Sequence, residues 1–318
     1  MQTRKRWIMG GVIALLLVLA LIGRPHLTPS TDEKITAGDD YIAVIRVDGP
    51  IVGGGGDIPG LLGAGAVATS EQLMKDVRRA TFDPHAKAVV LRINSPGGSA
   101  TATQEIGDEL DRLKEAGKPI VVSMGDSCAS GGYWLAAKGD YLFANPSTMT
   151  GSIGVYIGYT NYEELMNKLG IKNDKIKSGA HKDILSPDRP MTEKERALVQ
   201  DMVTDIYEQF VDVVADGRQM DRDAVKAIAD GRILTGRQAQ EAGLVDAMGN
   251  YYAALSYTAE QVGLDTVRPP IKEYGKDASW NRLFSMSLSR DIARGVRTAL
   301  SDLLTGAAQA DTEVPYAR

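Results

Sequence analysis

The sequence predicts an α/β protein with a largely parallel sheet, preceded by one N-terminal transmembrane helix. Strand-like and helix-like segments alternate from Tyr41 onward, which is typical of right-handed β-α-β units. The run AVVLRI at 88–93 is almost wholly apolar, as expected of a strand buried on both faces of a sheet. Residues 7–23 carry no charge and form an apolar run long enough to span a membrane with little tilt.

The N-terminal segment reads WIMGGVIALLLVLALIG and is followed by no A-x-A-like cleavage site. Three basic residues lie in the N-terminal stretch 1–6, whereas Arg24 is the firm positive charge just after the span. The positive-inside rule therefore predicts a single-pass protein of the cell membrane, with residues 1–6 in the cytoplasm and the rest outside. A cleaved signal peptide is the alternative, and it would export the body as well. Polar residues 24–40 are expected to form a tether.

The first half of the body alternates clearly between β-branched runs and amphipathic segments. Glycine and proline loops separate these segments, and Ser70 and Gly117 are the expected start and stop of two helices. The expected elements are a strand at 41–49, a flexible loop at 53–56, a helix at 70–80, a strand at 88–93, a loop at 94–98, a helix ending at Gly117, a strand at 119–124 and a tight turn at 125–132 that leads into a helix.

The second half is mostly helical from Met191. Thr192 and Glu195 have the spacing of a capping box, which predicts the start of a long helix reaching about Asp216. The remaining expected elements are strands at 141–146, 151–157 and near 175–178, and helices near 161–169, after Asp221 and at 235–243. We expect one domain over 41–270, then a C-terminal helix at 281–304 and a mobile tail within 271–318.

Composition excludes several function classes. The formal net charge of −5 and the pI of about 5.4 argue against nucleic acid as the main partner. The lone cysteine, Cys128, cannot form an intramolecular disulfide framework or a cysteine-clustered zinc site. Three histidines are few for a histidine-rich metal centre. We therefore expect chemistry from other residue types and no metal or organic cofactor.

Ser130 stands where a strand is expected to meet a helix, with two glycines directly after it. At this edge of an open α/β sheet its hydroxyl would be exposed. The Gly131 N–H would be free to stabilise developing negative charge, because the first N–H groups of a helix have no intrahelical acceptor. On these residues alone, a simple N-cap serine followed by a packing glycine pair is the favoured interpretation.

A second glycine pair, in NSPGG at 94–98, also follows a strand. Gly97 or Gly98 can present an N–H without obstruction by a side chain. Two such loops facing each other would form an oxyanion hole, with one donor from each. An ordinary turn is the alternative.

A serine nucleophile needs a base, and SGAHKDILSP offers His181 and Lys182. A lysine is a base only when neutral, which at an ordinary pKa of about 10.4 costs roughly 4.6 kcal/mol at pH 7. Burial in a dry pocket can lower a lysine pKa enough to remove that cost. Ser152, in TGSIG, is a candidate for orienting such an amine. Spacing alone does not decide between the histidine and the lysine.

The segments RINSPGG, GDSCASGGYWLAAKGDYLFANPSTMTGSIGV, SGAHKDILSP and ILTGRQAQEAGLVD together resemble the signal peptide peptidase A family in its short, single-repeat bacterial form. The resemblance runs from about Tyr41 to about Leu255. It implies a ClpP/crotonase-type spiral fold, with residues 41–270 as the peptidase domain. It also implies a ring-shaped homo-oligomer, for which we expect an octamer.

The resemblance assigns roles residue by residue. Ser130 would be the nucleophile, Lys182 the general base and Ser152 the residue that hydrogen-bonds the lysine amine. The N–H groups of Gly131 and of Gly97, favoured over Gly98, would form the oxyanion hole. In the short form of the family the serine and lysine of one site come from neighbouring subunits.

Three neighbours of these residues receive no catalytic role. Cys128 is expected to be a small apolar filler and Asp126 to shape its loop. A carboxylate close to an amine favours the charged form of that amine. A neutral Lys182 therefore requires the Asp183 carboxylate to lie away from it. Its side chain is therefore expected to point away from Lys182.

The expected function is that of an extracytoplasmic serine endopeptidase that degrades apolar signal-peptide remnants. Peptidase action on other membrane-associated peptides or proteins is the nearest alternative. An acyl-CoA hydratase or hydrolase of the same fold is disfavoured, because these loops lack its Glu or Asp pair and coenzyme A is cytoplasmic. A catalytically silent scaffold is the last alternative, and the presence of Ser130, Ser152 and Lys182 together argues against it.

Overall fold

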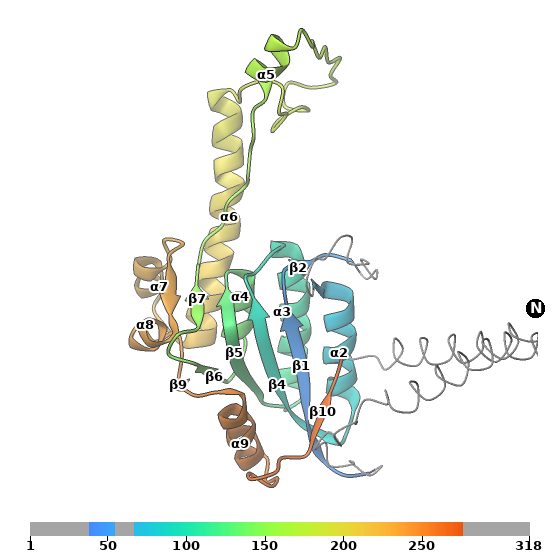
Figure 1. Cartoon of the computed structure of the whole chain (residues 1–318), viewed down its shortest axis with the longest axis vertical. Helices are drawn as coiled ribbons and strands as arrows, with labels where there is room; N and C mark the ends of the chain where they lie inside the picture. The colour runs from blue at the N-terminus through green and yellow to red at the C-terminus, as the bar shows by residue number, and fades with distance from the viewer. Residues whose placement is uncertain (1–37, 55–66, 276–318) are drawn as a thin grey trace, which may run out of the picture.

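The computed structural model describes residues 38–54 and 67–275 (Figure 1). The transmembrane helix predicted at 7–23, most of the tether at 24–40 and the C-terminal helix predicted at 281–304 lie outside these ranges. Within them, no helix is both long enough and apolar enough to cross a membrane.

A central sheet built from eight of the described strands confirms the α/β class (Figure 1). Its main path has the order β10-β1-β4-β5-β6-β9 and every pair along it is parallel. Strand β7 pairs with β5 in parallel and with β8 in antiparallel orientation, while β2 and β3 form a separate pair. The strands are β1 (Tyr41–Asp48), β2 (Ile51–Val52), β3 (Ala68–Thr69), β4 (Ala86–Ser95), β5 (Ile120–Ala129), β6 (Tyr141–Ala144), β7 (Met149–Gly151), β8 (Ile233–Thr235), β9 (Ala247–Met248) and β10 (Ile271–Glu273).

Helices cover both faces of this sheet, which explains why its central strands are apolar on both sides. Side chains such as Ile45 and Leu91 pack in the core beneath α2, α3 and α4, whereas Val44 and Val90 pack in a second cluster with α9. The helices are α2 (Ser70–Phe82), α3 (Ala100–Glu115), α4 (Gly131–Ala137), α5 (Glu163–Lys168), α6 (Glu193–Arg218), α7 (Arg222–Ile228), α8 (Gly236–Glu241) and α9 (Tyr251–Gln261).

Strand β5 differs from its prediction in a way that matters for the site. A turn was expected over 125–132, but the strand continues to Ala129 and the chain turns only at Ser130. Partners distant in sequence cause the extension, because Cys128 pairs with Ser95 of β4 and Ala129 pairs with Gly151 of β7. Gly125 therefore lies within a strand instead of a loop.

Other elements differ more simply. The strand predicted at 151–157 ends at Gly151, and no strand forms at 175–178. Thr69, not Ser70, occupies the N-cap position of α2 and makes no side-chain capping bond. Strand β10 pairs with β1, so the sheet continues beyond the domain boundary expected at residue 270.

Helix α6 is the longest described element and confirms the predicted capping box of Thr192 and Glu195. Its 26 residues span about 39 Å. Near its C-terminal end Phe210 packs against Trp134 of α4, with ring centroids 5.0 Å apart. Its N-terminal half extends beyond the sheet and carries at its far end α5 and the loops around it (Figure 1). We call residues 154–191 the arm.

Candidate active site

Ser130 occupies a sharp turn between β5 and α4 and has an unusual backbone conformation, with φ 53° and ψ −125°. A non-glycine residue in such a region costs about 1–3 kcal/mol, and strained turns of this kind expose nucleophiles between a strand and a helix. By position Ser130 is the N-cap of α4, but its side chain makes no capping hydrogen bond. The simple N-cap interpretation therefore fails, and the partly exposed hydroxyl remains available for chemistry.

Ser152 lies beside Ser130 because of the register between β5 and β7. Ala129 pairs with Gly151, and the Ser130 N–H donates to the Gly151 carbonyl at 2.9 Å. The two serines therefore each follow the last paired residue of adjacent parallel strands, whose backbones lie about 5 Å apart. Ser152 also has positive φ, 51°, and its N–H donates to the Arg232 carbonyl at 2.8 Å.

The two predicted glycine pairs do face each other. Gly97 has φ 96°, and a Cβ added there would lie 2.6 Å from the Gly131 nitrogen and 2.7 Å from Ser130 Cβ. A Cβ at Gly131 would lie 2.7 Å from Thr103 Oγ1. Glycine is therefore required at 97 for the close approach of the loops after β4 and β5, and at 131 for the contact with α3.

The N–H groups of the NSPGG loop differ in their partners. The Gly97 N–H donates to Ser95 Oγ at 3.1 Å. Gly98 is held by its neighbours, because Ile51 N–H donates to the Gly97 carbonyl and Ser99 N–H to the Ile51 carbonyl, both at 2.9 Å. Its own N–H has no acceptor within the described part of the chain. The buried Ser95 is a contributor that the motif did not reveal, although it belongs to the same loop.

Lys182 lies in a different part of the molecule, in a turn of the arm, where its side chain is exposed. The turn is tied to the first turn of α6, since Arg189 in the same loop donates to Glu195. Along α6, Glu195 and Phe210 are separated by about 22 Å. Phe210 contacts α4, and the first residue of α4 directly follows Ser130. Ser130 therefore lies near Phe210, whereas Lys182 lies near Glu195. One chain thus does not bring the serine and the lysine together.

Neighbouring groups offer no better nucleophile or base. Cys128 is fully buried, its thiol donates to the Gly132 carbonyl at 3.4 Å, and burial raises its pKa far above the usual range. His181 lies in the arm beside Glu195, with Nδ1 3.8 Å from Oε1, and so is as remote from Ser130 as Lys182 is. Asp183 points toward Arg189 and Lys177.

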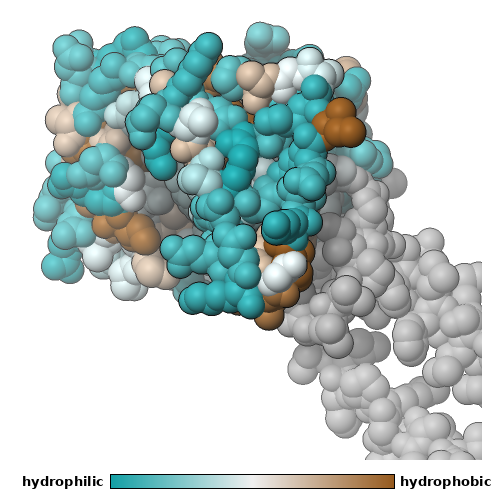
Figure 2. Space-filling view, turned by 90° about the horizontal axis from the view of Figure 1, so that it is seen from above, coloured by the Kyte–Doolittle hydropathy of each residue, from teal (hydrophilic) through white to brown (hydrophobic). Residues whose placement is uncertain are grey.

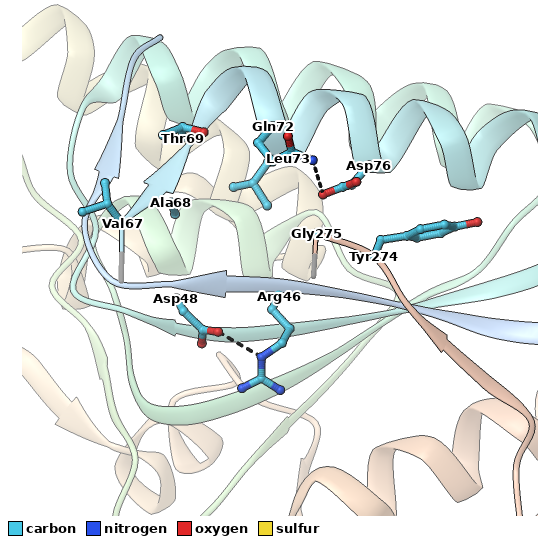
Figure 3. A pocket seen from close by; sticks show the side chains of 10 residues that line it. All are labelled: Arg46, Asp48, Val67, Ala68, Thr69, Gln72, Leu73, Asp76, Tyr274 and Gly275. Atoms are coloured by element: carbon cyan, nitrogen blue, oxygen red, sulfur yellow. Dashed lines mark hydrogen bonds and ion pairs between the residues drawn. The ribbon is translucent and has the colours of Figure 1, made fainter. Parts of the chain in front are cut away.

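A hollow of about 220 Å³ lies between the end of β1, the start of α2 and the residues after β10 (Figure 3). Its polar side chains bond each other, as Arg46 Nε donates to Asp48 at 2.9 Å and Gln72 to Asp76 at 3.1 Å. It contains none of the predicted site residues, so the candidate chemistry remains at the ends of β4, β5 and β7.

Comparison with known proteins places this site in a family. The family model described as Peptidase family S49 matches residues 112–265, a range that includes Ser130, Ser152 and Lys182. A protein of Enterococcus faecium named "Putative signal peptide peptidase SppA" is 36% identical over 273 residues, which cover 78% of each chain. The chain belongs to peptidase family S49, the signal peptide peptidase A family.

Two further relatives of this family are longer proteins. Protease 4 of Salmonella typhi is 37% identical over 69% of this chain and 34% of its own length. The chloroplastic serine protease SPPA of Arabidopsis thaliana is 33% identical over 72% of this chain and 34% of its own. The α/β architecture fits the S49 fold, and family membership makes the protein a serine-type peptidase.

Proposed function

We propose that this S49 peptidase is a membrane-anchored endopeptidase that degrades remnant signal peptides outside the cytoplasm with a Ser130–Lys182 dyad. The observation that carries the proposal is the geometry of Ser130, whose strained backbone presents an uncapped hydroxyl beside the glycine loop. The uncharged run at 7–23 and the name of the Enterococcus faecium relative support the membrane location and the substrate class. The proposed fold is of the ClpP/crotonase type.

The proposed oxyanion hole uses the N–H groups of Gly131 and Gly98. Gly131 is the first residue of α4, so its N–H has no intrahelical acceptor. We assign the second donor to Gly98 in place of Gly97, because the Gly97 N–H is already bonded to Ser95. A preorganised pair of donors of this kind stabilises the charge that develops on a peptide carbonyl oxygen.

The reaction follows from these groups. Neutral Lys182 takes the proton of Ser130 Oγ, which bonds to the peptide carbonyl carbon, and the resulting oxyanion accepts hydrogen bonds from the two glycines. As the C–N bond breaks, the lysine ammonium gives its proton to the leaving amine. Water deprotonated by the same lysine then hydrolyses the acyl-enzyme ester, and the proton returns to Ser130. Ser152, beside Ser130, would accept a hydrogen bond from the amine.

The dyad is proposed to form between neighbouring subunits of a ring. The arm carries Lys182 away from the Ser130 of its own chain, so a second copy has to supply the base. Exposed apolar side chains on the arm are consistent with burial in such an assembly, since they include Tyr156, Leu169 and Ile176. Viewed along α6 from the arm end, the surface is mostly hydrophilic with separate hydrophobic side chains (Figure 2). Burial by a neighbour would also provide the dry surroundings that a lysine base needs.

The test is hydrolysis of a fluorogenic apolar peptide by the full-length protein in detergent. Ser130→Ala and Lys182→Ala are each expected to lower kcat by about 10⁴-fold or more, because the two side chains act as one unit. His181→Ala is the matched control from the same turn and is expected to keep its activity. Equal loss with His181→Ala would contradict the assignment of the base. An inactive wild type, once assembled, would contradict the proposed function.

A further inference from the structure

Arg189 lies between two carboxylates of the arm and the start of α6. Its Nε and Nη2 donate to the two carboxylate oxygens of Asp183 at 2.9 and 2.8 Å. Its Nη1 and Nη2 donate to the two oxygens of Glu195 at 2.8 and 2.6 Å. Both carboxylates are therefore bound in the two-pronged geometry that guanidinium favours, and these are the strong, directional hydrogen bonds of proteins.

This clamp joins the turn that carries Lys182 to a rigid support. Glu195 is 2% exposed and belongs to the capping box of α6, where its carboxylate also accepts the Thr192 N–H at 3.0 Å. On the other side of the guanidinium, Nη2 also donates to the Asp183 carbonyl at 3.3 Å. The backbone directly after Lys182 is thereby fixed to the first turn of a 26-residue helix.

The clamp also controls the charge next to Lys182. An unpaired carboxylate beside an amine favours the charged form of that amine and so opposes a neutral base. Hydrogen bonds from Arg189, and next from Lys177 at 2.7 Å, hold the pKa of Asp183 far below its usual range. The charge of Asp183 is thus compensated, and its side chain is only 11% exposed. Lys175, Lys177 and Arg189 face Asp183 directly. One step further out, Asp188 pairs with Lys175, Glu195 pairs with Arg189, and His181 lies beside Glu195.

We propose that Arg189 is a positioning residue for the Lys182 base. It holds the base-bearing turn on α6 and keeps the Asp183 carboxylate directed toward itself instead of toward Lys182. The proposal rests on the proposed function, in which Lys182 is the base. It adds a residue that contacts neither the substrate nor Ser130 and acts through the geometry and charge of the turn.

The experiment measures kcat against pH for variants of the full-length protein in detergent. Arg189→Gln removes the clamp and leaves Asp183 with Lys177 and Lys175 as its basic partners, so that the carboxylate is freer to approach Lys182. We expect kcat to fall about 10- to 100-fold, as for a misplaced catalytic group. The midpoint of the acid limb should rise by about one pH unit, because the freed carboxylate favours the charged amine. Arg189→Lys, which keeps the charge but not the fork, should retain the wild-type midpoint with a smaller loss of kcat.

Asp183→Asn supplies an independent readout, because it removes the carboxylate and leaves the positive charges of Arg189 and Lys177 with Glu195 as the facing carboxylate. The midpoint should then move to lower pH, opposite to the shift in Arg189→Gln. A residue with a merely structural role would lower activity without such opposite shifts. If Arg189→Gln fails to fold by circular dichroism, the direction of the Asp183→Asn shift decides. Arg222→Gln is the matched control, since Arg222 also bridges two carboxylates, Glu208 and Asp212, at 2.8 and 2.7 Å.

Three results would overturn the inference, and two of them concern the pH profiles of the Arg189 and Asp183 variants. One is a wild-type profile in Arg189→Gln, and the other is an unchanged midpoint in both Arg189→Gln and Asp183→Asn. Failure of the proposed function itself would look different, because Lys182→Ala would then retain activity whatever Arg189 does. Equal losses in Arg222→Gln and Arg189→Gln would also overturn the inference, since the effect would not be specific to the turn of Lys182.

Discussion

The end of the sheet that carries Ser130 and the arm that carries Lys182 are built in opposite ways. Around Ser130, buried strands and close glycine contacts set the backbone so tightly that a positive φ is maintained at a serine. Around Lys182, α5 has no buried residue, and partly buried ion pairs hold the turn in place. The difference is consistent with the proposal that one chain completes the nucleophile side by itself and leaves the base side open to another chain.

Subunit complementation gives the largest expected effect and would break this comparison most directly. Ser130→Ala and Lys182→Ala chains are each expected to be inactive, but co-expressed chains should recover roughly a quarter of wild-type activity if neighbours share each site. The fraction follows because each site needs one intact serine and one intact lysine from the correct neighbours. Activity is measured on the purified mixed assembly. Persistent inactivity of a mixed assembly would mean that both groups act from one chain.

Gly97→Ala tests the tight side of the comparison. The added methyl would lie 2.6 Å from the Gly131 nitrogen, and φ 96° is strained for alanine. We expect kcat to fall about 10²-fold, comparable to loss of an oxyanion donor, with a smaller change in KM. Gly117→Ala is the control, because Gly117 also has positive φ, 78°, but a Cβ there meets nothing within 4 Å. Equal effects of the two changes would show that backbone strain alone is responsible.

Replacing a leucine by alanine in each region tests whether the core and the arm also differ in their contribution to stability. Leu91 of β4 is fully buried, whereas Leu169 of the arm is 66% exposed. Leu91→Ala should lower the free energy of unfolding by about 3 kcal/mol, and Leu169→Ala by less than about 0.5 kcal/mol. Urea denaturation at low protein concentration measures both. A loss with Leu169→Ala as large as with Leu91→Ala would mean that the arm is part of the core of the single chain.

Lowering the pH gives the smallest expected effect and first weakens the hydrogen bonds between Arg189 and Glu195. Hydrogen bonds from Arg189 lower the pKa of Glu195 from 4.5 to about 2. A lowered carboxyl pKa stabilises the folded state above the unfolded pKa, so this contribution should be lost as pH falls from about 4.5 to 2. Hydrogen exchange, corrected for intrinsic rates, should show residues 179–196 opening before β4. Opening of β4 first would contradict this order.

Much of the body could be predicted because its signals are local. The apolar run at 88–93 identified β4, and the capping box at Thr192 identified α6 to within two residues at its C-terminal end. Strands β8, β9 and β10 were missed, since two or three residues are too few for a periodic pattern and their pairing depends on distant segments. The run at 175–178 alternates lysine with Ile176 and Ser178 but finds no partner strand in the described chain.

The sequence by itself determined which residues are proposed to carry out the chemistry of this protein. A serine before two glycines and a second glycine pair after a strand can be recognised from residue types and spacing, whereas the choice of Lys182 over His181 came from the family resemblance. Only the tertiary structure decided how these groups are arranged. The β5–β7 register places Ser152 beside Ser130, and Ser95 accepts the Gly97 N–H. Helix α6 carries Lys182 away from the serine of its own chain. The physical reason is that hydrogen-bond register and helix packing depend on contacts between distant residues, which no local pattern encodes.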